Sequence, residues 1–263
     1  MSGFIELFMT KFSAPALGEA RQTGDGSWTL AHPDHAEWYH SADGALAEAK
    51  SLYVESSGIL GDFQRGTPDA ETVRVLDVGL GLGYNALATI DAWLRCGSRG
   101  RLEILSLENN DALFEAMRSG EAPWQVGWDP QWTGAVKNLD LVSDGLWQAT
   151  IAGSGGGELL WRVFLGDALS DHATGLVVRS GPFDYVWQDP FSPEKNPGMW
   201  GLEWFSAITP GVRPDGCLMT YSVARTVRDA LETAGWRIEK IPTTTRKKNW
   251  LKAFRLARPG DPK

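Results

Sequence analysis

Three glycines alternate along one short segment of this chain, directly after an acidic residue. Gly79, Gly81 and Gly83 follow Asp77 in the string D-x-G-x-G-x-G. Glycines at this spacing let a ligand approach bare backbone, and a helix that starts behind them favours a nucleotide-like ligand. Glycines also form tight turns that bind nothing, so the string needs support from residues elsewhere in the chain.

Asp77 and Glu108 give that support. Glu108 ends the next apolar run, where a carboxylate can accept hydrogen bonds from both ribose hydroxyls of a nucleoside. Asp77 stands beside the glycines, where its charge would attract a cation and repel a pyrophosphate. S-adenosylmethionine carries a sulfonium and an ammonium but no phosphate. The pattern therefore favours this methyl donor over a dinucleotide.

Asp167 and Ala168 follow another apolar run, at residues 158–165. At the end of a strand they would stand where the adenine amino group of the donor is expected. Asp167 could instead cap the helix that comes after it, and the sequence leaves both interpretations open.

Asp189 is the acidic residue that we expect to carry the chemistry. It follows the apolar run at 183–187 and precedes two prolines, Pro190 and Pro193. Prolines stiffen a loop, and loops at the carboxyl ends of strands are the usual place for ligands in such sheets. The alternative is that Asp189 only caps this proline-rich loop.

Side chains at the ends of several strands meet at one edge of a sheet when those strands run parallel. The apolar runs typical of buried strands lie at residues 73–78, 102–107, 183–187 and 217–222. With the helix-forming runs between them, they predict an α/β, Rossmann-like fold with a mostly parallel sheet, as in class I S-adenosylmethionine-dependent methyltransferases. We expect this core at residues 71–263 and an N-terminal extension at residues 1–70, forming one structural unit.

The extension is expected to hold a hairpin around the turn TGDGS and a helix at residues 44–56. A second hairpin is expected around the glycine-rich run GSGGG. Two histidines, His32 and His35, lie in a polar loop of the extension, where we expect them to be solvated.

The net charge of −8 argues against general nucleic-acid binding. Residues 241–260, however, contain six basic residues and no acidic one. These charges could guard a solvated edge strand or contact phosphates, and charge alone favours the first interpretation.

Several classes of protein are excluded by composition. No apolar run has the length of a membrane span, and the first residues lack the layout of a signal peptide. The two cysteines, Cys96 and Cys217, and the four histidines show no metal-ligand spacing. We therefore expect a cytoplasmic protein without membrane contact, disulfide or metal.

Beyond the glycine loop, five segments carry a resemblance to a known family. They read WYHSADGALAEAKSLYV, FLGDA, WQDPFSPEKNPGMW, TYSVARTVRDALETAGW and TRKKNWLKAF. Together they resemble the methyltransferase half of the MnmC family, the tRNA 5-methylaminomethyl-2-thiouridine methyltransferases, over residues 20–256. The most specific element is D-x-F-x-P-x-K-N-P-x-M/L-W, which runs here from Asp189 to Trp200. Departures from the family pattern occur at residues 36–39, at Leu82 and at the threonines 243–245.

The resemblance implies methyl transfer from S-adenosylmethionine to the aminomethyl nitrogen of a wobble uridine in the tRNA anticodon loop. Asp189 would accept a hydrogen bond from that amine and orient it, or take its proton. The resemblance further implies substrate or RNA contacts for Phe191, Lys195, Asn196, Tyr221, Arg246, Lys247 and Lys248. The chain contains no second dinucleotide loop, so we expect no FAD oxidase half and expect separate enzymes to supply the amine.

Two other functions stay open at this point. A methyltransferase acting on a small-molecule amine would suit the acidic composition better. A non-catalytic module that binds the donor or RNA would fit the departures near the N-terminal helix.

Overall fold

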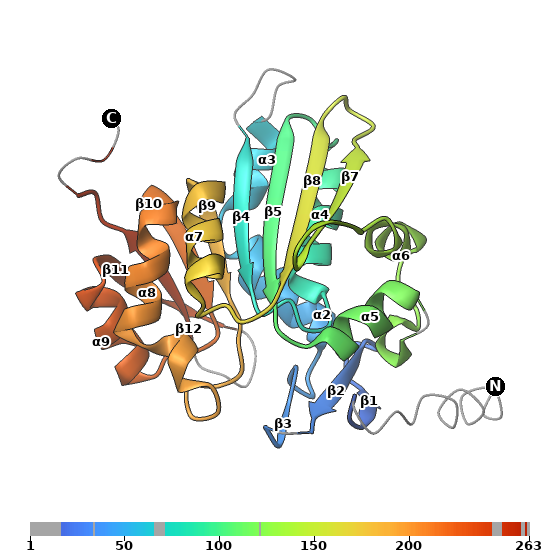
Figure 1. The fold of residues 1–263 in the computed structure, drawn as a ribbon, viewed down its shortest axis with the longest axis horizontal. Coiled ribbons are helices and arrows are strands. Elements are labelled where there is room, and N and C mark those ends of the chain that lie inside the picture. The colour runs from blue at the N-terminus through green and yellow to red at the C-terminus, as the bar shows by residue number, and fades with distance from the viewer. Residues whose placement is uncertain are drawn as a thin grey trace.

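The computed structural model describes residues 17–33, 35–65, 72–120, 122–243, 249–258 and 261 of the chain. Its centre is a nine-stranded sheet in the order β11-β12-β10-β9-β4-β5-β8-β7-β6 (Figure 1). The strands are β4 (Val73–Val78), β5 (Arg101–Glu108), β6 (Asp140–Ser143), β7 (Leu146–Ala152), β8 (Glu158–Leu165), β9 (Phe183–Gln188), β10 (Val212–Thr220), β11 (Trp236–Pro242) and β12 (Asn249–Arg255).

The five central strands, from β10 to β8, run parallel to one another. Antiparallel strands flank them on both sides, since β12 pairs with β10 and β7 pairs with β8. The expected Rossmann-like α/β fold with a mostly parallel sheet is confirmed. So is the hairpin around GSGGG, which joins β7 to β8. The carboxyl ends of β4, β5, β8 and β9 therefore meet at one edge.

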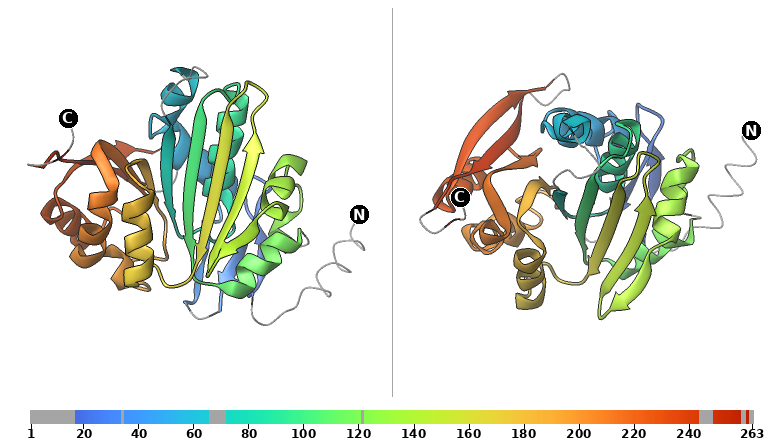
Figure 2. Two further views of the ribbon diagram at one scale, coloured as in Figure 1. Left: turned by 45° about the horizontal axis from the view of Figure 1, so that its top comes forward. Right: turned by 90° about the horizontal axis from the view of Figure 1, so that it is seen from above.

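Helices cover both faces of the sheet, as the view from above shows (Figure 2). Apolar residues alternate along β4, so that Val75 belongs to one buried cluster and Leu76 to the other. The first cluster contains residues of α3 (Ile59–Arg65), α4 (Tyr84–Arg95), α5 (Asp111–Ser119) and α6 (Pro130–Lys137). The second contains residues of α7 (Asp171–Ser180), α8 (Leu202–Ile208) and α9 (Arg225–Thr233).

The N-terminal segment forms a small sheet of its own, drawn in blue in Figure 1. Its strands are β1 (Ala20–Gln22), β2 (Trp28–His32) and β3 (Glu37–Trp38), and the expected hairpin is the β1–β2 pair. Leu30 of β2 is buried in the same cluster as Leu87 and Trp93 of α4. The small sheet is thus packed onto the core beside the glycine loop.

The helix expected at residues 44–56 is present but changes type along its length. It begins as α2 (Ala45–Glu48) and continues as a π-helix, η1 (Ala49–Glu55), in which the Ser56 N–H donates to the Ser51 carbonyl. Such wider turns occur most often near functional sites. Here the π-helical segment carries Tyr53, whose side chain is buried and faces the loop after β9.

Short 3₁₀ helices complete the described structure at η2 (Pro123–Gln125), η3 (Pro197–Trp200) and η4 (Thr209–Gly211). Across the described ranges, no helix combines the length and the apolar character that crossing a bilayer requires.

Candidate active site

A cavity of about 1070 Å³ lies at the carboxyl ends of β4, β5, β8 and β9. Its lining combines residues that follow these strands with residues of β2, β3 and η1 from the N-terminal segment. Pockets for single drug-sized ligands have volumes of about 300–1,000 Å³, so this cavity has room for a nucleoside-sized ligand and part of a second one. Parallel α/β sheets bind their ligands at this edge.

The glycine loop between β4 and α4 forms one side of the cavity. Gly79, Gly81 and Gly83 have φ angles of 85°, 52° and 86°, in the left-handed region that favours glycine. A Cβ on Gly79 would lie 3.0 Å from the Asp189 carbonyl oxygen, and one on Gly81 would lie 3.2 Å from the Tyr39 ring. Gly79 and Gly81 line the cavity.

Gly83 has a different place from the one expected. It is the N-cap residue of α4, and a Cβ there would lie 3.0 Å from the Met117 sulfur. It is not among the described residues that line the cavity. Gly83 therefore serves the packing of α4 against α5.

Asp77 is buried behind the glycine loop and does not reach the surface of the cavity. It is fully buried and is not one of the lining residues in the described ranges. Ser106 Oγ donates to Asp77 Oδ2 at 2.8 Å, and Trp161 Nε1 donates to Ser106 Oγ at 3.1 Å. Burial, together with the charges of Asp189 and Glu108, raises the pKa of Asp77 to about 8.

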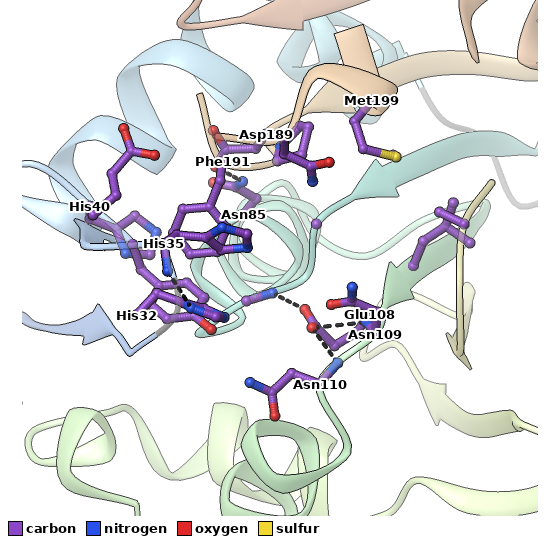
Figure 3. A pocket seen from close by; sticks show the side chains of 18 of the residues that line it. His32, His35, His40, Asn85, Glu108, Asn109, Asn110, Asp189, Phe191 and Met199 are labelled. Atoms are coloured by element: carbon purple, nitrogen blue, oxygen red, sulfur yellow. Dashed lines mark hydrogen bonds between the residues drawn. The ribbon is translucent and has the colours of Figure 1, made fainter. Parts of the chain in front are cut away.

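Glu108 lines the cavity at the end of β5 and holds the glycine loop in place. Its Oε2 accepts a hydrogen bond from the Gly81 N–H at 2.8 Å, and its Oε1 accepts from Asn109 and Asn110 at 2.9 and 2.8 Å (Figure 3). A carboxylate has about four acceptor positions, so one is left for a ligand. Burial raises the pKa of Glu108, while these backbone N–H groups oppose that rise.

Asp167 and Ala168 line the cavity after β8, and the capping alternative for Asp167 is wrong. The N-cap of α7 is Ser170, whose side chain accepts from the Ala173 N–H. Asp167 is exposed, and its Oδ1 accepts from the Leu169 N–H at 2.9 Å. The side chain is therefore held in a local turn at the rim of the cavity.

Asp189 lies where the loop after β9 meets the glycine loop. Its N–H donates to the Val78 carbonyl at 3.0 Å, which extends the pairing of β9 with β4. Its Oδ2 accepts from Asn85 Nδ2 at 2.7 Å. Burial and, after it, the Asp189 charge raise the pKa values of both Tyr53 and Tyr221, which shows that two phenols stand close to this carboxylate.

The loop that carries Asp189 is tied down along its length. The Tyr221 hydroxyl donates to the Pro190 carbonyl at 2.8 Å, and Trp200 Nε1 donates to the Phe191 carbonyl at 2.7 Å. Phe191, Asn196 and Tyr221 line the cavity. Lys195 is exposed, and within the described ranges it does not belong to the lining. Phe191, Asn196 and Tyr221 are thus brought together in the cavity lining, and Lys195 lies outside it.

The histidine interpretation made from the sequence is wrong. His32 and His35 line the cavity and pack against Phe191, with ring centroids 4.8 and 4.7 Å from it. Their short spacing in a polar segment is typical of a solvated loop. The ring that they contact, Phe191, lies far away in the sequence and could not be paired with them from the sequence alone.

The basic residues near the C-terminus divide into two groups. Arg246, Lys247 and Lys248 lie outside the described residues. Lys252 donates to the Ser57 carbonyl at 2.9 Å, and Arg255 forms an ion pair with Asp261 at 2.7 Å. These two cations are engaged in structural contacts.

Comparisons with known proteins agree with this geometry. Residues 154–255 match a family described as S-adenosyl-L-methionine-dependent methyltransferase. The chain is 30% identical, over 225 residues, to the tRNA 5-methylaminomethyl-2-thiouridine biosynthesis bifunctional protein MnmC of Azoarcus sp. (strain BH72), covering 85% of this chain and 34% of that protein. The protein of the same name from Ralstonia nicotianae is 30% identical over 219 residues, covering 80% of this chain and 30% of that protein.

A solved structure supports the same assignment over nearly the whole chain. The crystal structure of MNMC2 from Aquifex aeolicus has a TM-score of 0.71 and 26% identity, covering 99% of this chain and 78% of that one. The chain is thus similar to MnmC-type methyltransferases over most of its length. It spans about a third of the length of the curated MnmC relatives that it matches.

Members of this methyltransferase family depend on S-adenosylmethionine, and the cavity fits that molecule. The glycine loop offers two positions without Cβ atoms, Glu108 has one acceptor position left, and Asp167 is exposed at the rim. These groups can accept hydrogen bonds from hydroxyl and amino groups, and they present no phosphate-binding cation.

Asn85 and Tyr53 also line the cavity, and the sequence analysis did not single them out. Asn85 is a buried polar residue in the first turn of an otherwise apolar helix, and that contrast was the available signal. Tyr53 sits among apolar neighbours on η1 and gave no such signal.

Proposed function

We propose that this chain transfers a methyl group from S-adenosylmethionine to the aminomethyl nitrogen of a modified uridine at the wobble position of tRNA. The observation that carries the proposal is the position of Asp189, held by Asn85 beside the glycine loop in a cavity with room for a nucleoside-sized ligand and part of a second one. The names of the MnmC relatives support the identity of the acceptor.

The acceptor amine must be neutral when it attacks. An alkylammonium has a pKa of about 10, so deprotonation at pH 7 costs about 4 kcal/mol. S-adenosylmethionine supplies a methyl group on a sulfonium sulfur, which keeps the C–S electron pair and becomes a neutral thioether when the methyl leaves. The amine nitrogen gains the N–C bond and a positive charge, and then loses a proton to solvent.

Asp189 contributes orientation and charge compensation in this scheme. Its carboxylate accepts a hydrogen bond from an N–H group of the amine. This hydrogen bond directs the nitrogen lone pair away from the carboxylate and toward the methyl group. As positive charge develops on the nitrogen, the fixed carboxylate stabilises it. Orientation of this kind can contribute about 7 kcal/mol or more to lowering the barrier.

Asn85 fixes the direction of that carboxylate. Its amide donates to Oδ2 at 2.7 Å. Because Asn85 belongs to the first turn of α4, the glycine loop and the Asp189 loop are joined through this hydrogen bond. The donor site and the acceptor group are therefore positioned relative to each other before ligands bind.

The remaining residues divide between the two ligands. We assign Gly79, Gly81, Glu108, Asp167 and Ala168 to the donor. We assign Phe191, Asn196 and Tyr221 to the acceptor base. Lys195, Arg246, Lys247 and Lys248 are proposed contacts for the phosphates of the anticodon loop. A separate enzyme would supply the aminomethyl-uridine, and we propose that the reaction takes place in the cytoplasm.

The test is methylation of tRNA that carries aminomethyl-uridine at the wobble position, followed by mass spectrometry of its nucleosides. The expected result is conversion to the methylaminomethyl form. Activity should fall steeply with added salt, and the slope should decrease in the Lys247→Ala, Lys248→Ala variant.

Two outcomes would point to the other functions. Turnover of small amines without salt dependence would identify a small-molecule methyltransferase. Tight donor binding, measured by calorimetry, without turnover of any amine would identify a binding module.

A further inference from the structure

Four aromatic rings gather on the acceptor side of the cavity, and the proposed reaction so far uses only one of them. We refer to His32, His35, Tyr39 and Phe191 as the ring cluster. The centroids of the two histidine rings lie 4.3 Å apart, and the Tyr39 centroid lies 4.8 Å from that of Phe191. All four residues are partly buried and line the cavity, so part of each ring faces its interior.

The backbone fixes the ring cluster from two directions. The His35 N–H donates to His32 Nδ1 at 3.3 Å across the turn between β2 and β3, where Ala36 has a φ of 50°. The Ser192 N–H donates to Glu37 Oε2 at 3.1 Å and joins this turn to the loop that carries Phe191. Because the rings are held in place before a ligand arrives, stacking on them costs little conformational entropy.

The position of the ring cluster indicates which part of which ligand can stack on it. Figure 3 shows His32, His35 and Phe191 together on one side of the cavity, with Glu108, Asn109 and Asn110 on the other. The donor's adenosine is assigned to the Glu108 side, and an aliphatic amine has no flat face to stack. An unpaired nucleobase has such a flat face. Stacking on aromatic side chains tolerates any base, because every base has a π-face.

We infer that the ring cluster is the stacking site for the nucleobase that bears the acceptor amine, with His35 and Phe191 as its contact face. Phe191 follows Asp189 by two positions and lies beside it in Figure 3. A base stacked there would hold its aminomethyl arm next to the carboxylate. The ring cluster would thus select a nucleobase over an aliphatic amine. This inference rests on the proposed function.

The test is a double-mutant cycle between His35→Ala and an anticodon stem-loop RNA that is abasic at the wobble position. Affinities are measured by calorimetry with S-adenosylhomocysteine present. Stacking of one base on an aromatic side chain changes affinity by about five- to a hundredfold. We expect His35→Ala to weaken binding of the aminomethyl-uridine RNA about tenfold and binding of the abasic RNA less than twofold.

Two variants separate stacking from a loss of structure. His35→Ala keeps the backbone N–H that bonds His32, and His35→Phe, which retains a ring, should keep most of the affinity. His172→Ala is the matched control, because it removes an exposed imidazole that stacks on Phe164 at 5.4 Å and lies outside the described cavity lining. It should bind both RNAs like the wild type.

Three results would overturn the inference. Equal weakening of both RNAs, or no weakening of either, would show that no base stacks on His35. Weaker binding of S-adenosylhomocysteine alone in His35→Ala would place the adenine there instead. Failure of the proposed function is seen separately, in the wild-type protein, as tRNA that is neither bound nor methylated.

Discussion

The two sides of the cavity are built in different ways. The donor side consists of the glycine loop and the residues that directly follow β5 and β8, and backbone N–H groups bonded to Glu108 hold it together. The acceptor side consists of side chains from the β2–β3 turn, from η1 and from the loop after β9. One side is thus set by local backbone geometry, and the other by contacts between segments far apart in the sequence.

Asp189 lies where these two sides meet. A Cβ on Gly79 would touch its carbonyl, and Asn85 of α4 bonds its carboxylate. The two sides are therefore in direct contact at this junction. Substitutions that affect one side, the other or their junction should give separable effects on donor binding, acceptor binding and turnover.

The largest effect is expected at the junction. Asp189→Asn keeps the shape of the side chain but removes the charge that compensates the developing ammonium, so kcat should fall by about 10²–10³-fold. The donor affinity, measured by calorimetry, should stay within about twofold. Asp140→Asn, on the exposed edge strand β6, is the matched control. If Asp189→Asn kept a tenth or more of the wild-type kcat, the Asp189 carboxylate would not be needed for the reaction.

A smaller loss of kcat is expected when the Asp189 carboxylate is kept but loses its hydrogen bond from Asn85. Asn85→Ala removes a 2.7 Å hydrogen bond to a charged group, which is worth about 1.5–3 kcal/mol, or about 10–100-fold in kcat. Donor affinity and the KM for tRNA should change little. The control is Asn138→Ala at the exposed end of α6. If kcat were unchanged, Asp189 would not depend on Asn85 for its orientation.

The donor side is tested by Glu108→Gln. The variant leaves Gly81 or the Asn109–Asn110 pair without an acceptor, so the loop should loosen and the donor Kd should rise by about tenfold. With saturating donor, kcat should stay within about threefold of the wild type. Glu115→Gln, exposed on α5, serves as control. An unchanged Kd would refute the assignment of Glu108 to the donor.

The smallest effect concerns the buried acid beneath the glycine loop. The pKa of Asp77 is raised from 3.8 to about 8, so the folded state binds its proton more tightly than the unfolded state does. Stability from this group is therefore present at low pH and is lost as pH rises toward the raised pKa. Denaturant titrations at pH 6 and pH 7 should show that loss in the wild type and not in Asp77→Asn. Parallel pH dependence in both proteins would contradict the raised pKa.

The two sides also differ in how far the sequence predicted them. The parallel strands, the glycine loop and the positions of Glu108 and Asp189 at strand ends follow from hydrophobic periodicity and local spacing, and these predictions are confirmed. The burial of Asp77 was not predicted, because the string D-x-G-x-G-x-G does not reveal whether its acid faces the ligand or the core. His32 and His35 were misinterpreted because their partner, Phe191, is brought to them only by tertiary packing.

The central claim is that Asp189 holds the acceptor amine beside the methyl donor. The most direct measurement is a crystal structure of the protein with S-adenosylhomocysteine and an aminomethyl-uridine stem-loop RNA. We expect S-adenosylhomocysteine to bind over Gly79 and Gly81. An Asp189 carboxylate oxygen should lie within about 2.6–3.2 Å of the amine nitrogen. An amine bound well beyond hydrogen-bonding distance of Asp189, or a donor product bound away from the glycine loop, would contradict it.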